Sequence, residues 1–182
     1  MKIYFCGAHA VGKSTLARFV SNNYQLPMIT ESARMILSEQ ELQIDSLRYD
    51  IKSANEYQKQ VFRRQIQEEE KYDSFVSDRS LVDVLAYSAQ HTYILSDLFY
   101  SPDLTTYLEK LREKDTYIFF VRPSKATLRA DGVREQINWD GIIAIDAMIK
   151  LLIKMWDLRY FQISTDSMQE RVDLISAVLS QK

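Results

Sequence analysis

The chain has 182 residues, of which 46% are hydrophobic and 26% are charged, and its 23 basic and 25 acidic side chains give a net charge of −2. This length suits a single domain, and the balanced charge gives no reason to expect nucleic acid or an anionic membrane as the main partner. Cys6 is the only cysteine, so no disulfide can form within the chain, and no apolar run approaches the ~20 residues of a membrane span. We therefore expect one domain over residues 1–182, located in the cytoplasm, with no signal peptide.

Near the N-terminus, residues 7–15 (GAHAVGKST) fit the phosphate-binding P-loop pattern G-x-x-x-x-G-K-[ST]. A short apolar run precedes the motif and helically spaced apolar residues follow it, so we expect a strand, a loop and a helix. Glycines let the backbone curl around phosphate oxygens, which backbone N–H groups and the helix N-terminus then hold. Lys13 would reach the β- and γ-phosphates, and the Ser14 hydroxyl would ligate Mg²⁺. The predicted nucleotide-binding residues are Gly7, Ala8, His9, Ala10, Val11, Gly12, Lys13, Ser14 and Thr15.

Strands and helices alternate along the rest of the chain. From hydrophobic periodicity and turn residues we expect strands at residues 2–6, 28–30, 74–77, 116–121 and 160–164. We expect helices at residues 13–23, 31–37, 53–72, 80–88, 101–114, 139–157 and 167–179. A capping box, Ser53 with Glu56, predicts where the third helix begins, and residues 38–53 are interpreted as a loop. The glutamates at residues 68–70 are interpreted as a solvated helix end.

The order of these elements predicts an α/β domain of three layers with a parallel sheet. The strand at residues 116–121 is apolar throughout, which indicates burial on both faces. In such sheets, crossovers are right-handed and ligands bind beyond the carboxyl ends of the strands. The groups that follow the five expected strands are the P-loop, Glu31, Asp78 with Arg79, Arg122, and residues 164–166. Polar groups therefore converge on one edge of the sheet.

Three of these residues suit phosphoryl transfer, which needs positioning and charge neutralisation. Glu31 could accept a proton from a substrate hydroxyl, or could act only as an acid in the first turn of a helix. Asp78 follows an apolar strand and could hold Mg²⁺ through water. Arg79 stands where hydrolytic ATPases have a second acid, so it suits binding an acceptor or a phosphate. The alternative for Asp78 and Arg79 is a buried ion pair, and Asp83 is interpreted first as part of a capping box with Ser80.

The segment at residues 122–138 resembles a lid that closes over phosphates. It is locally positive and contains glycine, and its Arg129 and Arg134 could stabilise charge in the transition state. The alternative is a solvated connection with surface charges. His9 is expected to serve only as backbone in the P-loop, and His91 is expected at the surface. With one cysteine and two distant histidines, the sequence gives no support for a zinc site.

Four segments together resemble the P-loop kinase group that includes the nicotinamide riboside kinase domain of NadR-like proteins. They are residues 7–15, 30–34 (TESAR), 77–87 (SDRSLVDVLAY) and 131–134 (DGVR), and the chain is also similar to deoxynucleoside and thymidylate kinases. The resemblance implies a five-stranded sheet of order 2-3-1-4-5, ATP as the donor, and a hydroxyl or monophosphate as the acceptor. It implies that Glu31 is the general base, that Asp78 and Arg79 lie on the acceptor and metal side, and that Arg129 and Arg134 belong to the lid.

Three functions remain open from the sequence. The first is an ATP-dependent, Mg²⁺-dependent kinase that acts on a nucleoside, riboside or nucleotide. The second is a kinase that phosphorylates a hydroxyl within DNA, although the even charge balance does not favour a basic groove. The third is an ATPase or nucleotide switch without an acceptor, against which stand the missing N-K-x-D motif and the missing double acid after the third strand. A homodimer is possible.

Overall fold

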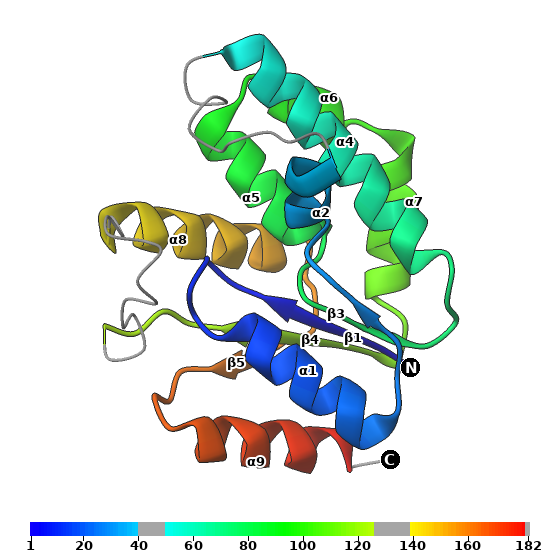
Figure 1. Ribbon diagram of the computed structural model, residues 1–182, viewed down its shortest axis with the longest axis vertical. Coiled ribbons are helices and arrows are strands. Elements are labelled where there is room, and N and C mark those ends of the chain that lie inside the picture. Colours follow the sequence, from blue (N-terminus) through cyan, green and yellow to red (C-terminus); the bar gives the residue numbers. More distant parts are fainter. Residues whose placement is uncertain (40–49, 126–138, 181–182) are drawn as a thin grey trace.

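The computed structural model describes residues 1–39, 50–125 and 139–180, and it consists of a parallel sheet with helices on both faces (Figure 1). The sheet order is β2-β3-β1-β4-β5, as predicted, and every neighbouring pair is parallel. The strands are β1 (Lys2–Cys6), β2 (Met28–Ile29), β3 (Phe75–Ser77), β4 (Thr116–Val121) and β5 (Phe161–Ile163). The predicted fold class is therefore confirmed.

Eight helices lie in the described ranges, and Figure 1 shows α1 and α9 on one face of the sheet and α5 and α8 on the other. Their bounds are α1 (Lys13–Tyr24), α2 (Ser32–Glu39), α4 (Ile51–Glu69), α5 (Leu81–His91), α6 (Leu95–Phe99), α7 (Pro102–Leu111), α8 (Trp139–Met155) and α9 (Met168–Leu179). Each helix predicted from the sequence is present, with ends that differ by a few residues.

The centre of the sheet is apolar because its middle strands are buried on both faces. Ile3 and Phe5 of β1 and Phe119 of β4 are fully buried, and Cys6 pairs with Phe120 at the end of the ladder. Burial of apolar side chains of this size stabilises a fold by about 1.5–3 kcal/mol each. Because the strands are parallel, their carboxyl ends meet at one edge, and the P-loop follows β1 at that edge.

The predicted N-cap of α4 is wrong by three residues, because Asp50 caps the helix in place of Ser53. Asp50 is the N-cap, and its Oδ1 accepts a hydrogen bond from the Lys52 amide at 3.0 Å. Its Oδ2 accepts the Ser53 hydroxyl at 2.5 Å, so Ser53 lies inside the helix. Aspartate is among the strongest N-cap residues, and it replaces the capping box that the sequence predicted.

The interpretation of the glutamates at residues 68–70 as a solvated end is wrong for Glu69. This side chain is 7% exposed, and its carboxylate accepts hydrogen bonds from Tyr4 Oη, Tyr107 Oη and Gln65 Nε2. The buried positions of α4 continue at a spacing of four from Val61 through Gln65 to Glu69, so this polar pair lies on the inner stripe of the helix.

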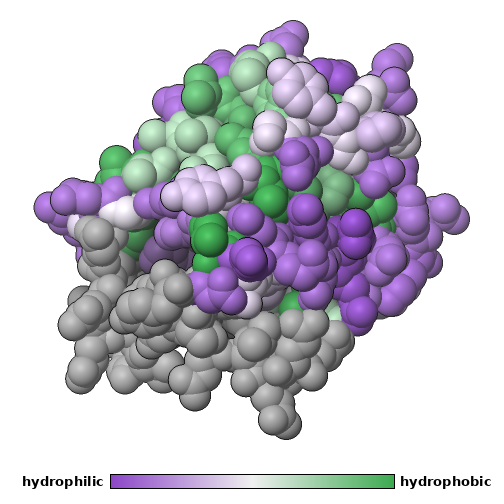
Figure 2. Space-filling view, turned by 90° about the horizontal axis from the view of Figure 1, so that it is seen from above, coloured by the Kyte–Doolittle hydropathy of each residue, from purple (hydrophilic) through white to green (hydrophobic). Residues whose placement is uncertain are grey.

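The outer surface is mostly hydrophilic on the face that Figure 2 shows, with hydrophobic residues gathered over one part of it. The most exposed large hydrophobic side chains in the described ranges are Tyr93, Tyr100 and Leu151. Among the helices of residues 1–39, 50–125 and 139–180, none is long and apolar enough to cross a membrane.

Candidate functional site

The P-loop has the backbone conformation that its two glycines permit. Gly7 has φ of 150° and Gly12 has φ of 94°, values that residues with a side chain rarely adopt. A Cβ built on Gly7 would lie 2.4 Å from the Val121 carbonyl oxygen of β4, so the loop can cross the end of β4 only with glycine. Gly12 is the N-cap of α1, which brings the helix N-terminus to the curl of the loop, a setting that binds anions.

Lys13 lies inside this curl. Its side chain donates from Nζ to the Ala8 carbonyl at 2.6 Å, and the residue is 5% exposed. Burial, together with the nearby Arg79, lowers the pKa of Lys13 to about 8, although Asp83, Asp78 and Glu31 act in the opposite direction. The loop therefore holds a poorly solvated cation, which a phosphate would stabilise.

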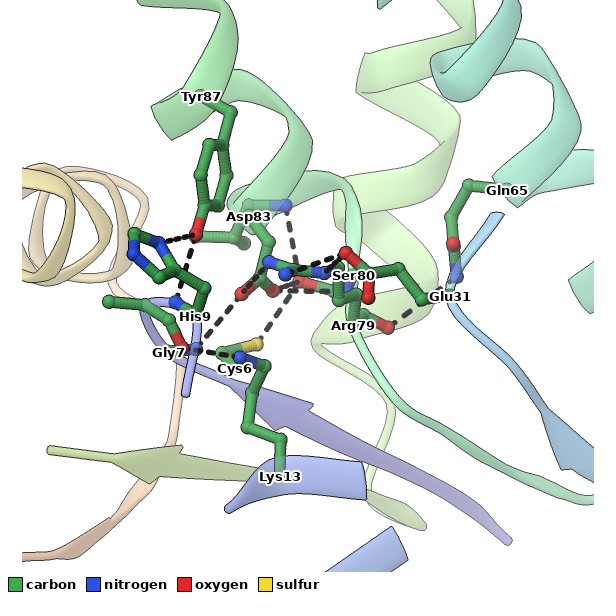
Figure 3. A network of polar contacts seen from close by, with 12 residues as sticks. Cys6, Gly7, His9, Lys13, Glu31, Gln65, Arg79, Ser80, Asp83 and Tyr87 are labelled. Atoms are coloured by element: carbon green, nitrogen blue, oxygen red, sulfur yellow. Dashed lines mark hydrogen bonds and ion pairs between the residues drawn. The ribbon is translucent and has the colours of Figure 1, made fainter. Parts of the chain in front are cut away.

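Helix α5 holds the P-loop from one side through Asp83. Its Oδ1 accepts the Gly7 amide at 2.9 Å, and its Oδ2 accepts the Ser80 amide at 3.0 Å (Figure 3). The predicted capping box of Ser80 and Asp83 is present, and the same carboxylate also anchors the first residue of the P-loop. Asp83 is fully buried, so it links helix capping to the shape of the loop.

One helical turn further along α5, Tyr87 makes a second contact with the P-loop. Its hydroxyl accepts the His9 amide at 2.9 Å and lies 3.1 Å from His9 Nδ1 (Figure 3). The exposed His91 stacks on the Tyr87 ring at 6.3 Å between centroids. The expectation that His9 contributes backbone is compatible with this geometry, which adds a side-chain contact that the sequence did not suggest.

Helix α9 holds the loop through Arg171, a residue that sequence reasoning missed. Its Nη1 donates to the Val11 carbonyl and its Nε donates to the Thr165 carbonyl, both at 2.7 Å. The residue is 1% exposed, and its Nη2 is buried without a hydrogen-bond partner. The sequence pattern that points to Arg171 is its position four residues before Ile175, on the buried stripe of α9.

The ends of β2 and β3 bring Glu31 and Arg79 together, as the sequence predicted for neighbouring strand ends. Arg79 Nε and Nη2 each lie 2.7 Å from Glu31 Oε1, and both side chains are nearly buried (Figure 3). Arg79 Nη1 is buried without a hydrogen-bond partner and lies 3.8 Å from Asp83 Oδ1. Burial opposes the charge of Arg79, but the surrounding acidic groups, Glu31 foremost, raise its pKa above the usual value.

Arg79 is also held by the elements around it. Its backbone has φ of 147°, and its guanidinium carbon lies 5.0 Å from the centre of the Tyr87 ring. Tyr87 and Asp83 therefore each lie beside both the P-loop and Arg79. A non-glycine residue with positive φ persists where its surroundings determine it, and such residues cluster at functional sites.

Asp78 lies at the end of β3, close to the start of α1. It is 5% exposed, and its amide donates to the Ile29 carbonyl at 3.0 Å. Burial raises the pKa of Asp78, whereas Lys13 and a hydrogen bond from the Ser14 hydroxyl lower it. The two residues predicted to hold Mg²⁺ thus lie together. Oxygen ligands of this kind suit Mg²⁺, which usually takes one or two protein groups and completes its shell with phosphates and water.

The lid prediction falls mostly outside the described residues, and this includes Arg129 and Arg134. Arg122 is described, and Asp146 of α8 binds it at 2.9 Å (Nε to Oδ1) and 2.7 Å (Nη2 to Oδ2), so it faces α8. Lys125 Nζ lies 5.4 Å from the Trp139 ring.

Within residues 1–39, 50–125 and 139–180, no group of three or more His, Cys, Asp or Glu side chains is placed to hold a metal ion.

A parallel sheet of order 2-3-1-4-5 with a P-loop at the end of its central strand defines a P-loop domain. The sequence matches the family described as the AAA domain over residues 2–171, and the chain belongs to that family. No curated protein matches the sequence.

Several solved structures share the fold at low sequence identity. Deoxyadenosine kinase from M. mycoides with bound dATP is 18% identical, with a TM-score of 0.68 and all of both chains covered. The NadR protein in complex with NR is 13% identical, with a TM-score of 0.74, all of this chain and 52% of that chain. Shikimate kinase from Acinetobacter baumannii in complex with shikimate is 10% identical, with a TM-score of 0.59, all of this chain and 95% of that chain. The predicted resemblance to the P-loop kinase group is thus confirmed.

Proposed function

We propose that the protein is an ATP-dependent kinase that transfers the γ-phosphate to a hydroxyl or monophosphate of a nucleoside-like small molecule. The observation that carries this proposal is the Glu31–Arg79 pair, whose atoms lie 2.7 Å apart beside the P-loop. A carboxylate beside an arginine at two strand ends suits an acceptor whose hydroxyl loses a proton to the carboxylate and whose charge the arginine offsets. The similar structures solved with dATP and with NR support a nucleoside-like ligand.

In this reaction the P-loop and Lys13 hold the triphosphate, and their positive charge offsets the charge that develops on the transferred group. An oxygen of the acceptor forms a bond with the γ-phosphorus while the bond to the β–γ bridging oxygen breaks and ADP leaves. Where the acceptor is a hydroxyl, its proton moves to Glu31. Arg79 contacts Oε1 of Glu31, so the proposed base would act beside a fixed cation.

Arg79 would serve the acceptor side of the reaction. Its Nη1 is a buried donor without a hydrogen-bond partner, and the missing hydrogen bond costs about 1–3 kcal/mol, which the ion pair with Asp83 Oδ1 at 3.8 Å offsets only in part. An oxygen of the bound acceptor or of the transferred phosphate would satisfy this donor after a small movement. Binding of the ligand would thus remove an energetic penalty that the free protein carries.

Ser14 and Asp78 would hold Mg²⁺ with the nucleotide. The Ser14 hydroxyl lies close enough to the Asp78 carboxylate to lower its pKa, so the two side chains are neighbours between the P-loop and β3. When bound, the ion would neutralise phosphate charge.

We also propose that Arg129 and Arg134 close over the phosphates as a lid. We further propose that the chain forms one domain and that it works in the cytoplasm.

A transfer screen with γ-labelled ATP tests this function. The acceptors are nucleosides, nucleotides, nicotinamide riboside, shikimate and a duplex DNA, and Lys13→Ala is the inactive control. We expect label on a nucleoside-like acceptor with the wild-type chain alone. Label that appears only as free phosphate would favour an ATPase, and label on the duplex would favour a DNA kinase.

A further inference from the structure

A buried amide, Gln65 of α4, contacts residues at the two strand ends that carry Glu31 and Arg79, and Figure 3 shows it beside the backbone of Arg79. Its Oε1 accepts the Ser32 hydroxyl at 3.1 Å, and Ser32 is the residue directly after Glu31. Its Nε2 has two hydrogens, which point to Glu69 Oε1 at 2.7 Å and to the Ser77 hydroxyl at 3.0 Å, and the Arg79 carbonyl lies 3.4 Å from the same nitrogen as a weaker, shared acceptor. One side chain therefore connects the start of α2, the end of β3 and the backbone of Arg79.

Glu69 fixes the direction of this amide. Its Oε1 receives Gln65 Nε2 at 2.7 Å and Tyr107 Oη at 2.8 Å, and its Oε2 receives Tyr4 Oη at 2.7 Å. Because Oε1 accepts two donors, the amide nitrogen of Gln65 must face Glu69, and the amide oxygen must then face Ser32. The tyrosines come from β1 and α7, so the carboxylate is itself held on two sides.

The backbone of Arg79 is strained, and the Gln65 network contributes to holding it in place. Its φ of 147° lies in a region that strains a residue with a side chain, and such a conformation persists only where its surroundings hold it. Gln65 binds the carbonyl of this strained residue, while Glu31, Asp83 and Tyr87 hold its guanidinium. An apolar side chain at position 65 could fill the same space but could not hold the carbonyl.

We propose that Gln65 and Glu69 are positioning residues for phosphoryl transfer, which set the distance and angle between Glu31 and Arg79 without touching the substrate. This inference rests on the proposed function, because it assigns these residues to the acceptor half of that site. The hydrogen bonds of Gln65 go to Ser32, Glu69, Ser77 and Arg79. Those that hold the P-loop come instead from Asp83 and Tyr87 of α5 and from Arg171 of α9. Loss of the Gln65 network should therefore alter the use of the acceptor and leave nucleotide binding intact.

The test compares Gln65→Met with Gln67→Met, the same change on the exposed side of the same helix. We expect Gln65→Met to lower kcat/KM for the acceptor on the order of tenfold to a hundredfold, as for a misplaced reacting group, with KM for ATP within about twofold. We expect Gln67→Met to match the wild type in both constants. Values for Gln65→Met within about twofold of the wild type would overturn the proposal, as would equal losses of acceptor and ATP use.

Two further measurements apply if Gln65→Met does not fold or if the wild type transfers phosphate to no acceptor. Ser32→Ala removes only the bond to Gln65 Oε1, and if Gln65→Met does not fold, the same fall in acceptor kcat/KM is required of this variant. If the wild type transfers phosphate to no acceptor, the proposed function fails, and hydrogen–deuterium exchange decides the positioning role by itself. Faster exchange in peptides that span residues 29–36 and 75–82, seen with Gln65→Met and not with Gln67→Met, supports it, and unchanged exchange overturns it.

Discussion

The two halves of the candidate site are built in different ways. The proposed nucleotide half consists mainly of nine consecutive residues, 7–15, whose backbone N–H groups would do most of the binding. The acceptor half combines Glu31 after β2, Arg79 after β3 and Gln65 from α4, which lie far apart in the sequence. A local motif can therefore specify the first half, whereas the second depends on how the sheet and helices pack. This difference predicts that the two halves fail separately when mutated.

The largest effect is expected on the nucleotide half, from Lys13→Ala. Removal of the ammonium group leaves the phosphates without their cation, so we expect phosphoryl transfer to fall on the order of a thousandfold or more. The measurement is transfer of label from ATP, with circular dichroism melting to show that the fold survives. A variant that remains active would contradict the assignment of the P-loop.

The second-largest effect is expected on the acceptor half alone, as a loss of turnover in Glu31→Gln. Glu31→Gln keeps the shape of the side chain but removes the base, so we expect turnover to fall roughly a hundredfold while ATP binding is unchanged. Single-turnover transfer and equilibrium binding of an ATP analogue measure the two quantities. Turnover near that of the wild type would mean that Glu31 is not the base and serves only as an acid at the start of α2.

A smaller effect tests the link between the halves, because Asp83 contacts both Gly7 and the neighbourhood of Arg79. Asp83→Ala removes a cap and leaves buried amides unpaired, so we expect it to destabilise the fold by about 2–3 kcal/mol and to weaken nucleotide binding. The control is Asp103→Ala, an exposed acid in the first turn of α7, which should cost less than about 1 kcal/mol. Urea unfolding and nucleotide titration measure both, and equal costs for the two variants would contradict the link.

The smallest effect concerns the pH dependence of stability through Glu69. Burial raises its pKa from 4.5 to about 7, although hydrogen bonds from Gln65, Tyr4 and Tyr107 and the charge of Lys110 act against this shift. Between these pH values the folded chain binds a proton that the unfolded chain has released, so stability falls as the pH rises, and it levels off above pH 7. The slope is at most about 1.4 kcal/mol per pH unit.

Chemical unfolding from pH 4.5 to 8 measures this slope for the wild type and for Glu69→Gln. The variant cannot take up the proton, so its difference from the wild type should change with pH over this window and become constant above it. A constant difference across the whole range would mean that Glu69 titrates with its ordinary pKa.

Much of the fold could be predicted because its signals are local. The P-loop, the apolar strand Thr116–Val121 and the capping residue Ser80 each act through neighbours in the sequence, and all three are present in the structure. The sheet order followed from resemblance to known kinases, and it is confirmed. The start of α4 was missed because two capping patterns competed, and Asp50 gives the stronger cap.

The supporting residues of the site could not be predicted in the same way. Glu69 lies within a run of three glutamates that has the pattern of a solvated surface, and only its tyrosine partners from β1 and α7 make it a buried acceptor. Arg171 lies more than 150 residues from the P-loop carbonyl that it binds, a contact that no short motif encodes. Both residues stand on buried stripes of their helices, and a charged residue on such a stripe is the signal to follow.

The most direct test is the fate of the γ-phosphate when labelled ATP is incubated with the wild-type chain and with Glu31→Gln, in the presence of the best acceptor. We expect the wild type to place most of the label on the acceptor, and Glu31→Gln to lose this transfer while it still binds ATP. Label released only as free phosphate at the same rate by both proteins would contradict the claim that the P-loop and the Glu31–Arg79 pair form one transfer site.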